Sequence, residues 1–446
     1  MSSGTSDHQR RRDMVMTGIG DGVALFASAP ETIRTHDSEH PYRQNTDFYY
    51  LTGFDEPQSV LILAPSHPEI RSCLFVRRKD KQQEIWNGQR LGLKEAKRLS
   101  GVDAAYPIEE LDQRIDSFLE TGDLLYYAFD ADKSLNDQVV ARLMRYRRSR
   151  ARSGRGPRGV LDPGPLVHEL RLRKSPADVV GMKRAVDVSA EGHLAAMRYA
   201  RPGMREYEIE AIVEYVFTSR GAQSPAYPSI VASGANLTTI HYSTNRERVP
   251  NGSLVLVDAG AEVDYYCGDL TRTFPISGTF SPEQRAIYEI VLASNLKAIE
   301  TCKPGKTFNA DVNDAAARVL VDGLLHLGLL AGSAQEHLEK ETHKRFTIHR
   351  IGHWLGMDTH DVGSYRVNGD WRPLEPGMVV TIEPGLYIPA EPDIDERFRG
   401  IAVRIEDDVL ITPSGHDVLS ARLAKSIPDV EEVIAQGRAS GSALFA

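Results

Sequence analysis

The sequence predicts two domains, an α/β domain at residues 1–172 followed by an α+β domain at residues 173–446. Length is the first reason, because 446 residues exceed what one ordinary hydrophobic core serves. Composition is the second, since 41% hydrophobic and 26% charged residues are typical of a globular protein. The third is the order of the expected elements, which alternate strand and helix in the first part and lose that alternation afterwards.

Short apolar runs predict the strands of the first domain, and segments with helical periodicity separate them. The runs are VALFAS, SVLILAPS, SCLFV and DLLYYAF, and the clearest helical segments are GLKEAKRLSG and SLNDQVVARLMRYRR. This alternation is typical of an α/β domain.

A basic segment at residues 142–159 carries eight arginines together with Gly, Ser and Pro. It is typical of a helix end and a solvated linker, and we expect it at the junction of the two domains. The alternative is a basic surface for nucleic acid or for a protein partner. The net charge of −9 argues against nucleic acid as a general partner, because phosphate binding needs a positive field.

Helix start signals are clear in the second domain. Ser175 and Pro176 open a long helix that is expected to stop at Pro202 and Gly203, and Ser281 begins a capping box. Further helices are expected at residues 205–221 and 309–330. The apolar runs LVLVDAG, DLTRTFP, MVVTIEPGLY and IAVRIEDDVLIT predict strands among these helices.

Four acids and one histidine of the second domain form the candidate metal-binding set. Each acid lies in or at the end of an apolar stretch, where an unpaired carboxylate is costly to desolvate unless a cation compensates it. The five residues are Asp258, Asp269, His353, Glu383 and Glu406.

Local sequence patterns predict that several of these acids lie at strand ends. Asp258 and Asp269 are expected on two paired strands joined by a turn, and Glu383 is expected at the tip of a strand that Pro384 ends. Arg404 and Glu406 would share one strand face, because side chains alternate with a period of two.

The oxygen-rich set favours two divalent ions, with Mn²⁺ as the first choice and Co²⁺ or Zn²⁺ as alternatives. Two ions about 3.5 to 4 Å apart would lower the pKa of a shared water and supply hydroxide for hydrolysis. Cys267 is a second candidate for a ligand, against the interpretation as a buried neutral thiol. An odd number of cysteines, three, predicts no disulfide framework.

Histidines and absent motifs narrow the chemistry further. His349, His353 and His360 lie in one glycine-rich segment that we expect to be a loop, and His241 stands apart. HExxH, GxSxG and P-loop motifs are missing, which disfavours thermolysin-like, serine-hydrolase and nucleotide-binding functions. The first twenty residues contain no signal-peptide pattern, so a cytoplasmic protein without membrane spans is expected.

The segments VDAGAEVDYYCGDLTRTFP, HRIGHWLGMDTHDVG, TIEPGLY and VRIEDD resemble the pita-bread metallopeptidases, and specifically the Xaa-Pro aminopeptidase (aminopeptidase P) family. YRQNTDFYYLTGFDEPQSVLIL and EIWNGQRLG resemble the amino-terminal domain of the same enzymes. The resemblance implies a creatinase/aminopeptidase-like catalytic domain that releases the first residue from peptides with proline second. Prolidase, which cleaves Xaa-Pro dipeptides, is the nearest alternative.

The resemblance also implies roles. Asp258 and Asp269 would bind one ion, the other would be bound by Asp269, His353, Glu383 and Glu406, and a bridging hydroxide would attack the peptide. Glu383 would pass a proton to the leaving proline nitrogen. His241 and His360 would flank the scissile carbonyl and the proline ring. Catalytic or substrate-binding positions are further implied for His349, Tyr387 and Arg404.

In the first domain, the resemblance places Asp37 and Trp86 where they would bind substrate in a neighbouring subunit, which implies a homo-oligomer, a dimer or a tetramer. Thr359 departs from the family pattern, and the arginine of the following loop is either Arg366 or Arg372. Methionine removal and a non-enzymatic module with a structural metal site are the remaining alternatives.

Overall fold

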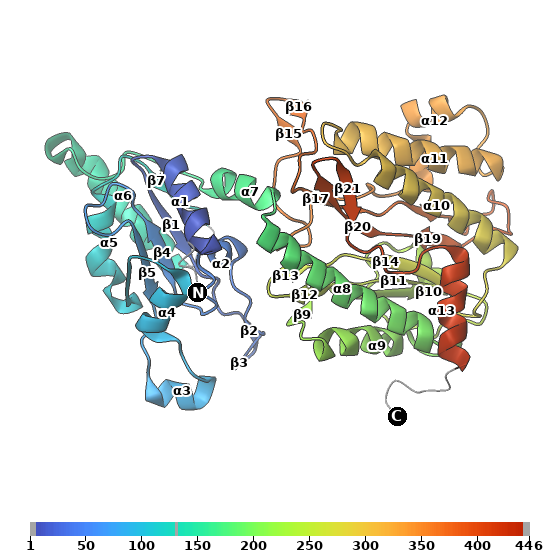
Figure 1. The fold of residues 1–446 in the computed structure, drawn as a ribbon, viewed down its shortest axis with the longest axis horizontal. Coiled ribbons are helices and arrows are strands. Elements are labelled where there is room, and N and C mark those ends of the chain that lie inside the picture. The colour runs from blue at the N-terminus through green and yellow to red at the C-terminus, as the bar shows by residue number, and fades with distance from the viewer. Residues whose placement is uncertain (1–5, 130–132, 440–446) are drawn as a thin grey trace. The chain divides into compact units, whose positions relative to one another are not determined.

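The computed structural model describes residues 6–129 and 133–439. The chain divides into two compact units, Met1–Leu170 and Arg171–Ala446, which are described separately (Figure 1). Residues 1–5 of the polar amino-terminal segment lie outside the described part. No helix in that part combines the length and the apolar composition needed to cross a bilayer.

A six-stranded sheet forms the centre of unit 1, in the order β6-β5-β4-β1-β7-β8. β4 runs antiparallel to both of its neighbours, whereas the other pairs are parallel. The strands expected from the four apolar runs are confirmed. The six strands are β1 (Val23–Ala27), β4 (Val60–Leu63), β5 (Ser72–Val76), β6 (Ala104–Pro107), β7 (Leu125–Tyr126) and β8 (Val160–Leu161).

Helices flank this sheet, and a short ribbon, β2 (Ile33–Thr35) with β3 (Ser38–Glu39), stands apart from it. The helices are α1 (Asp7–Ile19), α2 (Thr46–Thr52), α3 (Lys81–Asn87), α4 (Gly92–Ser100), the 3₁₀ turn η1 (Ile108–Glu110), α5 (Leu111–Leu119), α6 (Lys133–Ser153) and α7 (Gly164–Leu172).

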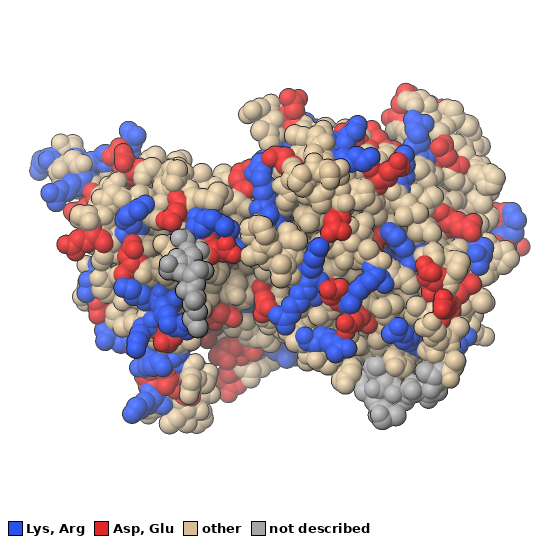
Figure 2. Space-filling view, viewed as in Figure 1, with Lys and Arg blue, Asp and Glu red and all other residues tan. Residues whose placement is uncertain are grey.

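The arginine-rich segment folds mostly as the end of α6, and Figure 2 shows Lys and Arg atoms gathered there. Arg142, Arg145 and Arg150 make ion pairs with Asp112, Asp116 and Asp123 of the same unit. The segment therefore belongs to unit 1, and the division of the chain comes later, at Leu170 and Arg171. The expected helix end is confirmed, but the segment is not the junction itself.

The helices of unit 2 begin where their capping residues predict. Ser175 and Asp178 form a capping box before α8, and Ser281 and Gln284 form another before α10. In Figure 1, α8 with α9 and α10 with α11 lie on opposite sides of the strands of this unit. The helical elements are α8 (Pro176–Tyr199), α9 (Glu206–Ser219), η2 (Gly234–Thr238), α10 (Pro282–Thr301), η3 (Phe308–Val312), α11 (Asn313–His326), α12 (Ala334–Glu339), η4 (Thr342–Arg345) and α13 (Ile427–Ala439).

The strands of unit 2 form several small sheets. One contains β10 (Ile230–Ser233), β11 (Leu254–Asp258) and β14 (Thr271–Pro275), and a second contains β9 (Ser224–Pro225), β12 (Ala261–Val263) and β13 (Tyr266–Cys267). A third contains β17 (Val379–Ile382), β20 (Asp407–Thr412) and β21 (Gly415–Val418), and two pairs are β18 (Gly385–Tyr387) with β19 (Ala402–Arg404) and β15 (Arg366–Val367) with β16 (Asp370–Trp371).

Two of the predicted apolar runs divide into two strands each, the first at Pro384 as expected and the second at a break that was not expected. Residues 378–387 divide into β17 and β18 around Glu383 and Pro384, since proline has no N–H to donate to a ladder. Residues 401–412 divide into β19 and β20 around Glu406, and the two parts pair in different sheets. Both breaks leave a carboxylate at a strand end.

Candidate metal centre

Paired strands bring the first two acids close together. β11 and β14 are antiparallel with Asp258 opposite Thr271, and Asp269 lies just before β14. A simple turn between them was expected, but the connection contains the strands β12 and β13. A Cβ atom on Gly260 would lie 1.7 Å from the Gly268 carbonyl oxygen, so the close approach of these segments requires glycine.

Thr271 holds Glu406 beside the same strand. The Glu406 N–H donates to the Thr271 carbonyl oxygen at 3.1 Å, and the Thr271 hydroxyl donates to the Glu406 carboxylate at 2.8 Å. The same hydroxyl accepts from Arg404 Nε at 3.1 Å. Arg404 and Glu406 therefore meet through Thr271, and the single strand face expected for them is interrupted. Thr271 was not identified from the sequence. Its position two residues after Asp269 could have indicated that both side chains face the site, because side chains alternate along a strand.

The loop that carries His353 lies against β17. His353 and Thr381 exchange hydrogen bonds, from Thr381 N to the His353 carbonyl at 2.9 Å and from His353 N to the Thr381 hydroxyl at 3.0 Å. Gly352 has a φ of 153°, and a Cβ atom there would lie 2.0 Å from the Thr381 carbonyl oxygen. The expected glycine-rich loop is confirmed, and its close contact with β17 explains the glycine.

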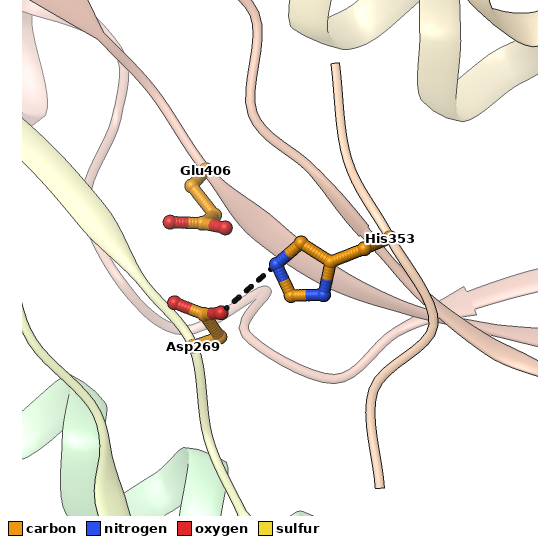
Figure 3. A group of neighbouring side chains, drawn as sticks. All are labelled: Asp269, His353 and Glu406. Atoms are coloured by element: carbon orange, nitrogen blue, oxygen red, sulfur yellow. Dashed lines mark ion pairs between the residues drawn. The ribbon is translucent and has the colours of Figure 1, made fainter. Parts of the chain in front are cut away.

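Three of the predicted ligands converge directly. Asp269, His353 and Glu406 each offer one ligand atom, and these atoms lie within 4.8 Å of one another (Figure 3). His353 Nε2 is 3.3 Å from Asp269 and 3.7 Å from Glu383. The Nδ1 atom lies 3.0 Å from the Trp354 carbonyl, which can only accept, so Nδ1 carries the proton and Nε2 is free to bind a metal ion.

Tyr227 links the remaining acid to this group. Its hydroxyl lies 2.7 Å from a carboxylate oxygen of Asp258 and 2.6 Å from one of Asp269. Arg404 contacts the other oxygen of Asp258. Sequence reasoning missed Tyr227, because a tyrosine in SPAYPSIV carries no charge, spacing or motif that marks it.

The electrostatics of the cluster show a shortage of positive charge. Desolvation raises the pKa of Glu406 well above its ordinary value, and the neighbouring Asp269 and Glu383 raise it further. Desolvation also raises the pKa of Glu383, although His353 and Arg404 oppose the effect. Burial lowers the pKa of His353, but hydrogen bonding to Asp269 and its charge outweigh burial and raise that pKa to about 9.

These donors fit divalent cations. Four carboxylates with one imidazole make a hard, oxygen-rich set, and the raised pKa of Glu406 shows that its ionised form lacks compensation. A cation among these oxygens would supply that charge. Asp258, Asp269, His353, Glu383 and Glu406 are the residues that would hold it.

A hydrogen-bonded chain adjoins Glu383. Arg404 donates to the Tyr387 hydroxyl oxygen at 2.6 Å, and this hydroxyl lies 2.8 Å from His349 Nε2. His349 Nδ1 is 2.6 Å from the Arg350 carbonyl oxygen and 3.6 Å from a Glu383 oxygen. The carbonyl assigns the proton to Nδ1, so Nε2 accepts from Tyr387. Desolvation, with the Arg404 charge, lowers the pKa of His349 to about 4, so it is neutral near pH 7.

His360 and His241 lie at the exposed side of the group. The His360 ring packs edge-on against His353 with centroids 4.3 Å apart. Desolvation lowers the pKa of His360, and the charges of His353 and His241 lower it further. His241 also lowers the pKa of His349, so it lies near both rings.

The other predicted residues lie elsewhere or are held differently. Asp37 and Trp86 belong to unit 1, where both are exposed, and their expected role toward another subunit stays a prediction. Cys267 is buried, and its thiol donates to the Met357 carbonyl at 3.6 Å rather than joining the metal-binding group. Arg366 stacks over Trp371, whereas Arg372 is buried.

Family models match both parts of the chain. Residues 180–413 match metallopeptidase family M24, and residues 8–126 match the aminopeptidase P N-terminal domain. The chain belongs to metallopeptidase family M24. Its resemblance to aminopeptidase P is thereby confirmed, and members of this family are peptidases that use metal ions.

Relatives and solved structures agree with this M24 assignment. The chain is 41% identical to the Xaa-Pro aminopeptidase of Escherichia coli over 435 residues, which cover 97% of this chain and 98% of the relative. The structure of the Pseudomonas aeruginosa aminopeptidase PepP matches at a TM-score of 0.94 with 43% identity, covering 97% and 98% of the two chains. A structure of an alanine variant of E. coli aminopeptidase P in complex with substrate matches at a TM-score of 0.92 with 40% identity, covering 97% and 98%. The chain therefore has the two-domain pita-bread fold of aminopeptidase P.

Proposed function

We propose that this protein is a metal-dependent aminopeptidase that releases the first residue of peptides whose second residue is proline. The observation that carries the proposal is the convergence of Asp269, His353 and Glu406, with Glu383 beside them, in an M24 fold that matches aminopeptidase P along both units. Prolidase activity on dipeptides is the alternative, since both reactions break the same kind of bond.

Two divalent ions are the proposed cofactors, with Mn²⁺ first and Co²⁺ or Zn²⁺ as alternatives. Asp258 and Asp269 would hold one ion, and Asp269, His353, Glu383 and Glu406 would hold the other. When bound, such ions lower the pKa of a water molecule toward about 7 and so provide a nucleophile at neutral pH. The oxygen-rich donors support manganese as the first choice.

Glu383 is the proposed proton carrier. The peptide nitrogen of proline has no hydrogen and must be protonated as the bond breaks. A carboxyl group with a raised pKa can take a proton and return it near neutral pH, and burial among other acids raises the pKa of Glu383. Its place beside His349 and His353 puts it between the metal-binding donors and the hydrogen-bonded chain to Arg404.

The neutral histidines are proposed to contact the substrate. His349 is held in one tautomer, because its Nδ1–H donates to the Arg350 carbonyl and its Nε2 accepts from Tyr387, and Nδ1 lies 3.6 Å from a Glu383 oxygen. Desolvation, with the charges of His353 and His241, lowers the pKa of His360, so this ring is neutral near pH 7, and His241 lies beside it. Neutral imidazoles can donate to the scissile carbonyl and pack against the proline ring.

A homo-oligomer is also proposed. Trp86 is 83% exposed on α3, a helix without buried residues, and Asp37 is exposed on the same unit. An exposed tryptophan is unusual on a monomer and is typical of an interface. Light scattering of the wild type and of Trp86→Ala would test this, since the variant should have a smaller mass. A cytoplasmic location is proposed from the three buried free cysteines.

Cleavage of defined peptides tests the main proposal. The metal-loaded protein should release alanine from Ala-Pro-Ala and leave Ala-Ala-Ala and Met-Ala-Ser intact. Glu383→Gln should fold normally and be inactive, which separates catalysis from a structural metal site. Absence of release from Ala-Pro-Ala would refute the proposal, and preference for Ala-Pro over the tripeptide would identify a prolidase.

A further inference from the structure

A cavity of about 680 Å³ in unit 2 adjoins the candidate metal centre. It is lined by residues of α11, of α12 and of the segment 341–351, together with Trp371. His349 and Gly385 line it as well, and these residues stand beside Glu383 and Tyr387. The cavity and the site therefore share His349.

The size of the cavity decides which part of a peptide it can take. An aminopeptidase holds a single residue before the bond that it breaks, so only the part after the bond can extend over several residues. A volume of about 680 Å³ lies within the range of pockets that enclose ligands of drug size. The cavity thus suits the residues that follow proline.

Arg350 is the cation of this cavity that remains available to a ligand. Within residues 6–129 and 133–439, no carboxylate lies within ion-pair distance of its guanidinium. Of the other two cations of the lining, Lys344 pairs with Glu341 at 2.7 Å, and Arg318 donates to the uncharged Gln335 at 3.1 Å. Arg350 directly follows His349, and both residues line the cavity.

We propose that this cavity binds the peptide segment after proline and that Arg350 pairs there with a carboxylate of the substrate. The carboxylate is either the carboxyl terminus of a short peptide or an Asp or Glu side chain of a longer one. Arginine suits this task because its planar guanidinium binds carboxylates through two parallel hydrogen bonds. The inference rests on the proposed aminopeptidase function and adds a preference for acidic substrates.

Two substrate pairs separate the sources of the carboxylate. Ala-Pro-Ala is compared with its carboxyl-terminal amide, and Ala-Pro-Asp-Ala-amide is compared with Ala-Pro-Asn-Ala-amide. The wild type should show kcat/KM about threefold to fivefold higher for at least one charged member, which is the effect of one partly exposed ion pair. The preference should enter through KM and should fall with added salt, because salt screens exposed charges.

Arg350→Gln should abolish that preference, because glutamine is polar but carries no charge. Lys340→Gln is the matched control, since it removes one positive charge from the end of α12, where Lys340 pairs with Glu336. The control should keep the preference. Equal kcat/KM for charged and neutral partners in the wild type, or an Arg350→Gln variant that retains the preference, would overturn the proposal.

A binding measurement separates this proposal from the proposed function. Calorimetry with the peptides Pro-Asp-Ala-amide and Pro-Asn-Ala-amide reports the downstream side alone and needs no cleavage. Tighter binding of the acidic peptide to the wild type but not to Arg350→Gln supports the Arg350 site even where no Xaa-Pro bond is broken. Equal binding together with normal cleavage of Ala-Pro-Ala refutes the Arg350 site and leaves the aminopeptidase function intact.

Discussion

Two groups of buried carboxylates in unit 2 differ in how their charge is compensated. Asp361 accepts from Arg171 at 2.6 Å and from Lys174 at 2.9 Å, and all three side chains are at most 3% exposed. Burial alone would raise the pKa of Asp361, but the two cations lower it below its ordinary value. Among residues 6–129 and 133–439, Glu406 makes no ion pair, and its carboxylate accepts from the Thr271 hydroxyl. Desolvation and its acidic neighbours raise its pKa well above the ordinary value, although the charge of Arg404 opposes them.

Adjacent residues of β20 repeat this contrast. Asp407 pairs with Arg272 at 2.9 Å and with Lys425 at 2.7 Å, and these cations overcome desolvation and lower its pKa. Asp408 accepts from the Asp269 N–H, and among the described residues its other carboxylate oxygen has no partner. Desolvation and the charge of Asp269 raise its pKa well above the ordinary value. Asp361 and Asp407 thus pair directly with cations, whereas Glu406 and Asp408 make no ion pair within the part of the chain that the structure describes.

The largest expected effect comes from changing a carboxylate of the uncompensated group. Glu406→Gln should lower peptidase activity by about 10³-fold, because a bound metal ion contributes several kcal/mol to such a reaction. Without metal, the thermal midpoint should stay close to that of the wild type, since the raised pKa keeps Glu406 largely uncharged. Metal content per chain and melting curves with and without Mn²⁺ measure both effects.

Glu432→Gln, at an exposed acid that accepts from Gln436, is the control and should keep both metal and activity. Normal Mn²⁺ content in Glu406→Gln would contradict the assignment of Glu406 as a ligand.

Changing a carboxylate that is paired with cations should lower the stability of the fold. Asp361→Asn should destabilise the fold by about 3 kcal/mol, because it removes an anion from the buried Lys174 and Arg171. Asp361 has a lowered pKa, so its contribution is present above the unfolded value of about 3.9 and is lost as pH falls through the folded value. The difference in unfolding free energy from the wild type should therefore narrow below about pH 4.

Denaturant unfolding at several pH values measures this difference. Asp417→Asn, which removes the partner of the half-exposed Lys183, is the control and should cost far less. A difference that stays constant down to pH 2 would show that the charge of Asp361 does not stabilise the fold.

Tyr227→Phe tests the hydroxyl that joins the first two acids. Removing a hydrogen bond to metal ligands commonly weakens metal affinity by about tenfold to 100-fold, and the same range is expected here. Titration with Mn²⁺ measures it. Tyr288→Phe removes another buried hydroxyl, which donates to the Lys425 carbonyl at 2.8 Å, and should leave Mn²⁺ affinity unchanged. Equal affinities for the wild type and Tyr227→Phe would exclude Tyr227 from metal binding.

The smallest expected effect is the change in Mn²⁺ affinity per pH unit. The metal-free site holds protons near neutral pH, since Asp269 raises the pKa of His353 to about 9 despite its burial and desolvation raises that of Glu383. Metal binding must displace these protons, so Mn²⁺ affinity should rise between pH 6 and pH 9 by about tenfold per unit for each proton released. Calorimetry in buffers of different ionisation enthalpy counts the protons, and a count of zero would contradict this account.

Local residue patterns were sufficient for much of the fold. The four apolar runs of the first domain became strands, and the capping boxes at Ser175 and Ser281 marked helix starts. These signals are local, since capping and alternation depend on residues a few positions apart. The strand end at Glu383 was expected from Pro384, but the break at Glu406 was missed because pairing with different neighbouring strands, rather than local propensity, decides it.

By itself, the sequence determined which acids and histidines are available and that the acids stand at the ends of apolar strands, because residue type and short-range pattern carry this information. Only the tertiary structure decided that Tyr227 joins Asp258 to Asp269 and that Thr271 joins Arg404 to Glu406. It also decided that Asp361 pairs directly with Lys174, while the charge of Arg404 only partly offsets the desolvation and acidic neighbours of Glu406. Compensation of a buried charge depends on partners brought from distant parts of the chain, and no local pattern records them.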